Sequence, residues 1–353
     1  MTGSGPILVG ILRDHVAAGG ERFARIVRLA FADVRATGRL GREIELVEEQ
    51  ADGLPRGSAA SVEAAFRHLA ARDVAAIIGP AITDNGLIVR DLADATGLPC
   101  INWTGGEQTR SDWMFHYQVG SLEEEPAFLA LHLMQSGLRR IALVDDDSIV
   151  GRRYVEFFAE AATRFGITVA QQSDRGDLKT LIPRMRTGEP QAVLYLGLWD
   201  LARELAIALA TSGWRPRVFA NSALMYGHAM PDWRREWDGW QYVDAYADRN
   251  PVLRDVMARL GDEHGGAPVT AAAAYDMGRL VAEGIASAAE PSRAGIKAAL
   301  ERLKHIPAAL GAAGTTMGFG RWERAALKGS YLVLREWRGG ASVEVEGQAS
   351  APR

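Results

Sequence analysis

Short apolar runs alternate along the chain with segments in which apolar residues return every three or four positions. Residues 23–34 give the clearest helical pattern, because their apolar side chains share one face at 3.6 residues per turn. Runs that are apolar throughout, separated by amphipathic helices, are typical of parallel βαβ units. The pattern therefore predicts an α/β fold, with strands at 7–12, 44–47, 75–78, 141–144, 192–196 and 218–220.

The end of the chain has a different pattern. Extended segments at 331–334 and 343–345 flank the pair Gly339-Gly340. Glycine pairs form tight turns between antiparallel strands, so we expect a terminal β-hairpin.

Length and composition favour two folded domains. A chain of 353 residues is long for one hydrophobic core, and its 48% hydrophobic and 24% charged residues are ordinary for a globular protein. The formal net charge of −4 shows no basic excess, which argues against nucleic acid or anionic lipid as a partner. No apolar run approaches the roughly 18 residues of a membrane helix, so no membrane insertion is expected.

The first residues bear on the compartment. Residues 1–6 lead into the first apolar run without the basic segment, long apolar core and small-residue cleavage site of a signal peptide. Two compartments therefore stay open at this point: a chain from which a signal peptide has been removed would be periplasmic or at the cell surface, and otherwise the protein would be cytoplasmic. The single cysteine, Cys100, excludes an internal disulfide and is expected to be an inert core residue.

Polar and aromatic residues follow the predicted strands. In open parallel sheets, ligands lie outside the carboxyl ends of the strands, near helix N-termini that present free N–H groups. We therefore expect the functional residues in the segments at that edge, which are 14–15, 83–85, 103–106, 145–150, 199–200 and 222–226.

Four segments also stand in a characteristic order. They are Ala75-Ala76-Ile77-Ile78-Gly79-Pro80, the stretch from Gly97-Leu98-Pro99 to Thr104-Gly105-Gly106, the stretch 139–146 leading to Gly151, and Ala274-Tyr275-Asp276. In this order and spacing, nearly the whole chain resembles the leucine/isoleucine/valine-binding family of type I periplasmic solute-binding proteins, the substrate-binding components of branched-chain amino acid ABC transporters.

The resemblance implies two Rossmann-like lobes joined by a hinge of three crossovers. The extended segments 115–119 and 240–246 suit strands that enter such a hinge. We place the crossovers near Gly120, Ala247 and Lys328. The N-terminal lobe then comprises residues 1–120 and 248–328, and the C-terminal lobe comprises residues 121–247 and 329–353.

The resemblance also implies how a ligand is held. In amino-acid-binding members, the ligand carboxylate meets a serine or threonine and backbone N–H groups of the first lobe, which places Thr83 and residues 104–106 at that site. An acidic residue of the second lobe holds the amine, but no carboxylate stands at residues 221–223. A simple amino acid is therefore a poor candidate ligand, unless Asp146 or Asp200 supplies the charge from another loop.

The family's aromatic residue near Val150 is also absent, whereas Trp103 and Trp199 border the expected cleft from opposite lobes. Such a pocket suits a small organic ligand with an apolar or aromatic body and a carboxylate or other polar handle. The expected ligand-binding residues are Thr83, Asp84, Trp103, Thr104, Gly105, Gly106, Val150, Trp199, Asp200, Ser222, Tyr226 and His15.

Several aromatic and loop residues have a structural interpretation beside the functional one. Trp199 equally suits the closing of a sheet edge, His15 equally suits a surface loop, and Tyr226 suits packing better than binding. The pair Trp233 and Trp237, close to Trp240, is expected to form one packed cluster.

The predicted function is binding by hinge closure, without catalytic residues, cofactor or metal. The protein would deliver its ligand to an ABC permease. The alternative is a cytoplasmic ligand sensor that resembles amide-sensing regulators and acts on a regulatory partner. No nucleotide-binding or nucleophile motif indicates an enzyme.

Two further classes stay open. Asp145-Asp146-Asp147 follows a strand and would be the Mg²⁺ site of a metal-dependent enzyme, although the sequence shows no third oxygen ligand and no phosphate-binding partner. A degenerate pair of lobes that serves only assembly would bind no small molecule.

Overall fold

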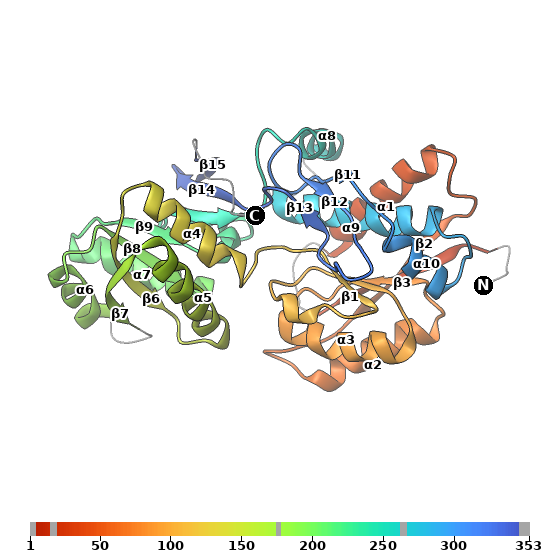
Figure 1. Ribbon diagram of the computed structural model, residues 1–353, viewed down its shortest axis with the longest axis horizontal. Coiled ribbons are helices and arrows are strands. Elements are labelled where there is room, and N and C mark those ends of the chain that lie inside the picture. The colour runs from red at the N-terminus through yellow and green to blue at the C-terminus, as the bar shows by residue number, and fades with distance from the viewer. Residues whose placement is uncertain (1–4, 15–19, 174–177, 262–266, 346–353) are drawn as a thin grey trace. The chain divides into compact units, whose positions relative to one another are not determined.

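The computed structural model describes residues 5–14, 20–173, 178–261 and 267–345 (Figure 1). The chain divides into two compact units, 1–119 with 246–331 and 120–245 with 332–353. It therefore passes from one unit to the other three times. The predicted crossovers near Gly120, Ala247 and Lys328 fall within three residues of these passages.

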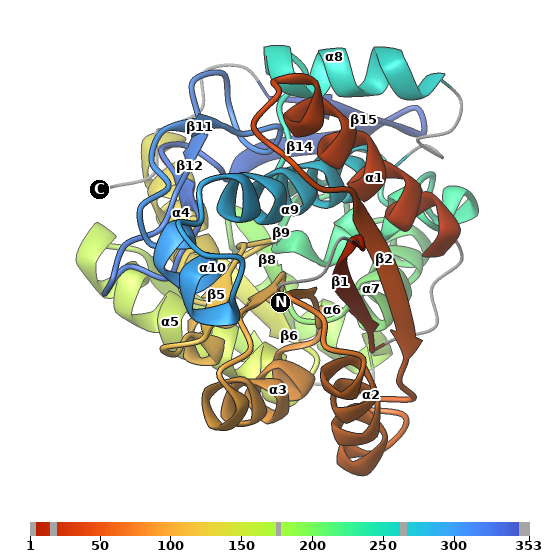
Figure 2. The same ribbon diagram turned by 90° about the vertical axis from the view of Figure 1, so that its right-hand side faces the viewer.

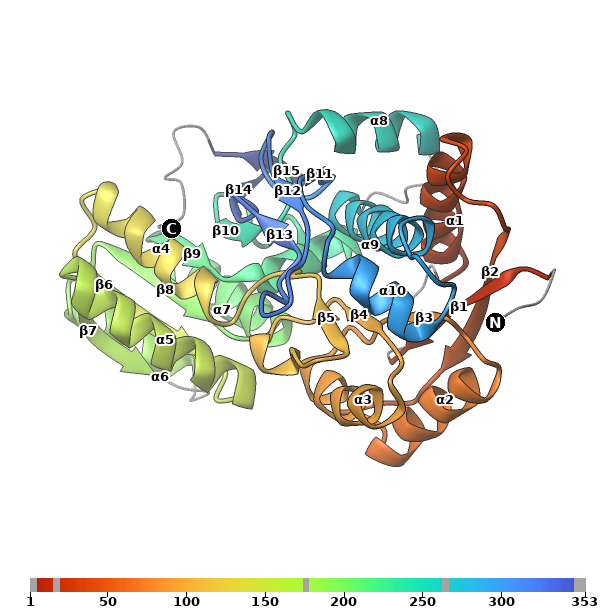
Figure 3. The ribbon, with the colours of Figure 1, turned by 45° about the vertical axis from the view of Figure 1, so that its right-hand side comes forward.

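Unit 1 (1–119 and 246–331) contains a five-stranded parallel sheet in the order β2-β1-β3-β4-β5. Helices α1 and α9 lie together on one face, and α2 and α3 cover the other (Figure 3). The strands are β1 (Ile7–Arg13), β2 (Ile44–Gln50), β3 (Ala76–Ile78), β4 (Cys100–Asn102) and β5 (Met114–His116), and the helices are α1 (Gly20–Ala36), α2 (Ala59–Ala71), α3 (Thr83–Thr96), α8 (Pro251–Leu260), α9 (Pro268–Ala286) and α10 (Arg293–Leu300).

A small antiparallel sheet in the order β11-β12-β13 also belongs to unit 1 (Figure 1), and Figure 2 shows its strands β11 and β12 from another side. Its strands are β11 (Ile306–Pro307), β12 (Thr316–Met317) and β13 (Leu327–Lys328). Cys100 is fully buried in the core between the main sheet and helices α2 and α3, as predicted. Burial raises the pKa of its thiol far above the usual range, so the thiol stays protonated.

Unit 2 (120–245 and 332–353) contains a seven-stranded sheet in the order β15-β14-β10-β9-β8-β6-β7. Its first five strands in the chain are parallel, and β14 and β15 form an antiparallel hairpin on β10. The strands are β6 (Arg140–Asp145), β7 (Thr168–Ser173), β8 (Ala192–Leu196), β9 (Arg217–Ala220), β10 (Gln241–Asp244), β14 (Val333–Arg338) and β15 (Ala341–Glu344).

Helices cover both faces of this sheet, with α4 packed on α5 and α6 packed on α7 (Figure 3). The core on the α6 and α7 side contains Trp237, Trp240 and Trp337. The helices are α4 (Glu124–Gln135), α5 (Ile149–Phe165), α6 (Leu178–Thr187) and α7 (Trp199–Ser212), and the 3₁₀ helices of the chain are η1 (Glu107–Thr109), η2 (Ser222–His228) and η3 (Pro231–Trp233).

The predicted elements are confirmed. Each predicted strand lies within or overlaps an observed one, and the helical pattern at 23–34 lies in α1, which buries Ile26, Val27 and Val34. The terminal hairpin turns at Gly339 and Gly340, whose φ angles are +59° and +81°. Positive φ at both turn residues matches the right-handed twist of the strands and favours glycine.

The tryptophan cluster is confirmed, but not by helical spacing. Trp233 ends the short helix η3, and the following residues form turns instead of a continued helix. The rings of Trp233 and Trp237 still meet edge to face at 6.0 Å.

Candidate functional site

The loop between β3 and α3 in unit 1 is held by the residue that follows β1. Asp14 is buried, and its carboxylate accepts the backbone N–H groups of Ala81 and Ile82 at 2.9 and 2.8 Å and the Asn85 side-chain amide at 2.9 Å. The N-cap residue Ile82 gives no side-chain hydrogen bond to the first turn of α3. The half-buried Thr83 therefore begins a helix whose N-terminus suits an anion.

The loop after β4 contains Trp103 and Thr104. Trp103 is half-buried and lies against the Phe23 ring of α1, with ring centroids 5.3 Å apart. Thr104 is fully buried, and its hydroxyl and N–H both donate to the Asn102 side-chain oxygen, at 2.9 and 3.2 Å. The Thr104 side chain therefore shapes the loop from inside.

His116 fixes the same loop from β5. Burial lowers the pKa of His116 to about 4, so the ring is neutral. Its Nε2–H donates to the Thr104 carbonyl at 2.7 Å, and its Nδ1 accepts the Arg110 guanidinium at 3.0 Å. This tautomer uses both ring nitrogens and holds residues 103–106 in place.

Glycine at 106 brings this loop against α3. A Cβ atom at Gly106 would lie 2.6 Å from the Thr83 methyl group, so any larger residue at position 106 would press on the Thr83 side chain. The structure thus brings Thr83 together with the loop of Trp103, Thr104 and Gly105. Asp84 is exposed beside Thr83, and His15 lies outside the described residues.

In unit 2, Asp146 joins the loops after β6 and β8. One of its carboxylate oxygens accepts the N–H and hydroxyl of Ser148, and the other accepts the Leu198 N–H at 2.7 Å. Asp145 accepts the Asp147 N–H at 3.1 Å. Within the described parts of the chain, no group of three His, Cys, Asp or Glu side chains could hold a metal ion. These contacts give the first two acids of the trio a role in loop structure.

The loop after β8 meets the loop after β9 through two aromatic rings. Trp199, the first residue of α7, stacks on Tyr226 of η2 with ring centroids 4.3 Å apart and an interplanar angle of 11°. Both rings are partly exposed. Val150 is half-buried beside Ile149, which is 66% exposed at the start of α5. Asp200 is exposed.

A carboxylate from a distant part of the sequence lies beside Ser222. Glu125 of α4 accepts the Ser222 N–H at 2.8 Å through one oxygen, and the Ser121 N–H at 2.7 Å and the Tyr154 hydroxyl at 3.2 Å through the other. Burial raises the pKa of Glu125 to about 7, against the lowering effect of these hydrogen bonds.

Asp146, one of the two alternative sources of charge, is engaged by two loops, and the carboxylate at Ser222 belongs to Glu125. Glu125 comes from the start of α4, which is distant in sequence from residues 221–223. The Ser-x-x-Glu pattern at 121–124, typical of a capped helix N-terminus, was the available signal for that helix start.

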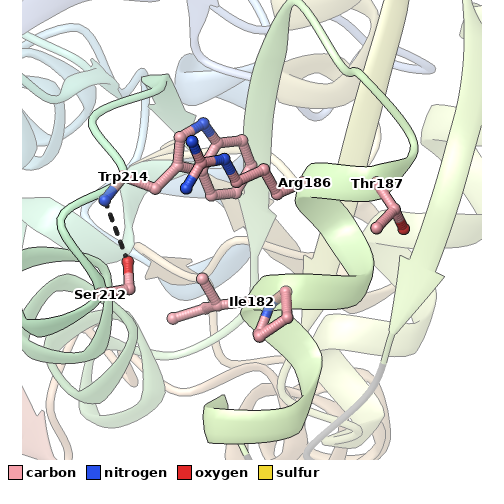
Figure 4. Close-up of a pocket in the computed structure, with 6 residues that line it drawn as sticks. Ile182, Arg186, Thr187, Ser212 and Trp214 are labelled. Atoms are coloured by element: carbon pink, nitrogen blue, oxygen red, sulfur yellow. Dashed lines mark hydrogen bonds between the residues drawn. The ribbon is translucent and has the colours of Figure 1, made fainter.

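A surface hollow of about 360 Å³ lies elsewhere in unit 2 (Figure 4). It is located at the C-terminal ends of α6 and α7, whereas the loops described above follow the carboxyl ends of β6, β8 and β9. It contains no expected ligand-binding residue and has one charged side chain, and it is lined by Ile182, Pro183, Arg186, Thr187, Ser212 and Trp214.

Comparison with known proteins gives a family and a fold. A family model described as "Periplasmic binding protein" matches residues 13–330. No curated protein matches the sequence. Among the described residues, every helix is too short or too polar to cross a membrane.

Several solved structures share the fold at low sequence identity. An ABC transporter substrate-binding protein from Desulfitobacterium hafniense in complex with Leu has a TM-score of 0.82 and 18% identity, over 96% of this chain and 100% of that one. The substrate-binding protein LivJ from Streptococcus pneumoniae in complex with isoleucine has a TM-score of 0.79 and 16% identity, over 98% of both chains. A solute-binding protein from R. palustris in complex with 4-hydroxybenzoate has a TM-score of 0.77 and 16% identity, again over 98% of both chains.

Proposed function

This chain belongs to the periplasmic binding protein family, and from that premise we propose that it is a non-enzymatic binding protein for a small organic ligand with an apolar or aromatic body and a carboxylate or other polar handle. The observation that carries the proposal is the stack of Trp199 on Tyr226 at the carboxyl edge of the unit 2 sheet. Two partly exposed rings that already stack offer a ligand an apolar surface, and little side-chain entropy is lost when the ligand binds.

Unit 1 supports the same ligand class with a different chemistry. The N-cap residue of α3 gives no side-chain hydrogen bond to the first turn, and Thr83 contributes a hydroxyl there. Hydroxyl and N–H groups at a helix start suit a carboxylate, and Trp103 adds an aromatic surface in the neighbouring loop. We propose that Thr83, Asp84, Trp103, Gly105 and Gly106 contact the ligand in unit 1.

Val150, Trp199, Asp200, Ser222 and Tyr226 are the proposed contacts in unit 2. Thr104 is proposed as a ligand contact through the backbone of its loop, because its buried hydroxyl is already bonded to Asn102. The three solved structures described above hold small carboxylates with an apolar or aromatic body, namely leucine, isoleucine and 4-hydroxybenzoate. Delivery of the ligand to an ABC permease, and residence in the periplasm or at the cell surface, complete the proposal.

A thermal-shift screen of the purified protein tests this function. The compounds are leucine, isoleucine, 4-hydroxybenzoate and related aliphatic and aromatic carboxylates, with neutral sugars for comparison. A ligand present at a hundred times its Kd adds about 2.7 kcal/mol of stability.

The control for the screen uses a second tryptophan. A shift that is lost in Trp199→Ala and kept in Trp322→Ala is expected, because Trp322 is 87% exposed in the connection between β12 and β13 and is not among the proposed ligand contacts. No shift with any carboxylate, or a shift that survives Trp199→Ala, would count against the proposal.

A further inference from the structure

Three segments that are distant in sequence meet on the Glu125 carboxylate within unit 2. They are the start of the unit at Ser121, the loop after β9 at Ser222, and helix α5 at Tyr154. Glu125 is fully buried, and no ion pair joins it among the described residues. Its carboxylate is therefore stabilised by hydrogen bonds and by its place in the first turn of α4.

The contact with Ser121 is reciprocal. The Ser121 N–H donates to the Glu125 carboxylate at 2.7 Å, and the Glu125 N–H donates to the Ser121 carbonyl at 3.1 Å. The Ser121 hydroxyl accepts the Glu124 N–H at 3.0 Å. Residues 120–121 are the first residues of unit 2, so Glu125 fixes the chain at the first crossover.

Gly120 shows how closely the crossover is packed against this carboxylate. A Cβ atom at Gly120 would lie 2.7 Å from the nearer Glu125 oxygen and 3.1 Å from the Ser222 hydroxyl. The Gly120 φ angle of +72° independently favours glycine. The first crossover, Glu125 and Ser222 therefore form one contiguous group.

The contact with Ser222 extends this group to the candidate ligand surface. Ser222 is the first residue of η2, which also contains Tyr226. Tyr226 stacks on Trp199. A displacement of Ser222 would therefore be passed to the aromatic pair through one short helix.

Protonation would change these contacts. A carboxylate accepts N–H groups at both oxygens, whereas the protonated acid carries a hydroxyl donor on one of them. The raised pKa of Glu125, caused by burial, places this change close to neutral pH. The titratable side chain in contact with Glu125 is Tyr154, whose own pKa is raised by burial so that it remains a neutral donor.

We propose that Glu125 is a positioning residue that couples the first crossover to the ligand-binding surface of unit 2. Its carboxylate holds Ser121 and Ser222 in one arrangement, so its loss alters ligand affinity although Glu125 does not contact the ligand. The inference rests on the proposed function for its effect on binding. The coupling itself is a property of the protein without ligand.

Hydrogen exchange measured by mass spectrometry tests the coupling directly. Glu125→Gln keeps the shape of the side chain and replaces one acceptor by a donor, and Glu124→Gln is the matched control on an exposed neighbour. We expect faster exchange in both 120–125 and 222–228 for Glu125→Gln and unchanged exchange for Glu124→Gln. Exchange that changes in 120–125 alone, or in neither segment, would overturn the proposal.

The pH dependence distinguishes positioning from a merely structural role. Protection of 222–228 in the wild type, corrected for intrinsic exchange rates, is expected to change between pH 6 and pH 8 and to be independent of pH in Glu125→Gln. Tyr154→Phe keeps the carboxylate and provides a milder variant if Glu125→Gln does not fold, with a smaller increase in exchange at 222–228. A wild-type profile that does not change with pH would contradict the proposal.

Binding is measured separately with 4-hydroxybenzoate and isoleucine as probes. If the wild type binds either, Glu125→Gln is expected to weaken that binding about 5- to 10-fold, a typical effect of losing one charge-assisted hydrogen bond. Equal affinity would refute the coupling. If the wild type binds no carboxylate, the proposed function fails, and the exchange data still decide the role of Glu125.

Discussion

Trp199 and Tyr226 stack with their ring centroids 4.3 Å apart, although they come from loops that follow two different strands, β8 and β9. Tyr226 also meets Trp233 at 5.6 Å, and the Arg203 guanidinium lies 4.9 Å from the Trp233 ring. Trp233 and Arg203 therefore pack next to the stacked pair and help to hold it in place. This relationship gives unit 2 a preformed aromatic surface at its carboxyl edge.

Removing the ring of Tyr226 should weaken ligand binding. Tyr226→Ala leaves Trp199 without its stacking partner, and we expect at least a ~10-fold higher Kd, since a stacked aromatic pair contributes ~0.5–1.5 kcal/mol beyond its buried area. Tyr226→Phe keeps the ring and is expected to stay within about threefold of the wild type. Calorimetry on the ligand from the screen measures both, and wild-type affinity in Tyr226→Ala would contradict the role of the stack.

Asp276 should be important for the stability of unit 1. Its fully buried carboxylate accepts the Tyr117 hydroxyl at 2.6 Å, the Ala309 N–H at 2.8 Å and the Leu310 N–H at 3.1 Å. Asp276→Asn places a donor against these donors, and we expect a loss of ~2–4 kcal/mol in the free energy of unfolding. Tyr117→Phe should cost ~1–2 kcal/mol.

Urea unfolding measures both losses, with Asp91→Asn as the control because the Asp91 side chain is exposed on α3. A loss in Asp276→Asn no larger than in Asp91→Asn would show that the buried hydrogen bonds are not needed.

Much of the fold could be predicted because each strand and helix is encoded locally. In an α/β protein, the apolar run at 192–196 predicts a buried strand, and the spacing of Ile26, Ala30 and Val34 predicts an amphipathic helix. The glycine pair at 339–340 predicts the hairpin turn. The division of the chain into interleaved units came from the family resemblance, since no local pattern carries it.

The contacts of the candidate site were less predictable. Asp14, Glu125 and His116 act on loops far away in sequence, and only the packed fold brings them there. Thr104 was expected to face the ligand, but its hydroxyl is turned inward to Asn102. Sequence indicates which loops reach the sheet edge, but it does not show which side chains of those loops point outward.

The pH dependence of stability should reveal the titration of the Glu125 carboxyl group. Its pKa is raised from 4.5 to about 7 in the folded protein, so between these values the folded state binds a proton that the unfolded state has released. The resulting stabilisation is complete below about pH 4.5 and is lost as the pH rises through about 7, with a slope of up to ~1.4 kcal/mol per pH unit.

Urea unfolding at pH 5, 6 and 8 checks this slope. Glu125→Gln should fall less steeply with rising pH than the wild type, and Glu124→Gln should follow the wild type. A constant difference between the wild type and Glu125→Gln across this range would show that Glu125 does not titrate there.

Gly120→Ala should lower the free energy of unfolding by more than the positive φ angle alone would cause. Gly137 has the same φ angle of +72°, but a Cβ atom there would meet nothing within 4 Å. Both alanine variants lose the freedom of glycine, worth about 1 kcal/mol, whereas only Gly120→Ala presses on Glu125 and Ser222. Urea unfolding should show a larger loss of stability in Gly120→Ala than in Gly137→Ala. Equal losses would mean that the crossover accommodates the added methyl group without strain.

Cys100 should be unreactive until the protein unfolds. The thiol is fully buried, and burial raises its pKa well above the usual range, so almost no thiolate is present at pH 8. Labelling with a thiol reagent should be slow in buffer and rapid in concentrated urea. Rapid labelling of the folded protein would contradict the packing of β4 against α2 and α3.

Calorimetry with one tryptophan removed from each unit tests the proposed function. We expect Trp103→Ala and Trp199→Ala each to raise the Kd of the ligand found in the screen at least ~10-fold, and Trp322→Ala to leave it unchanged. Undiminished binding in either Trp103→Ala or Trp199→Ala would argue against the proposed contacts in that unit.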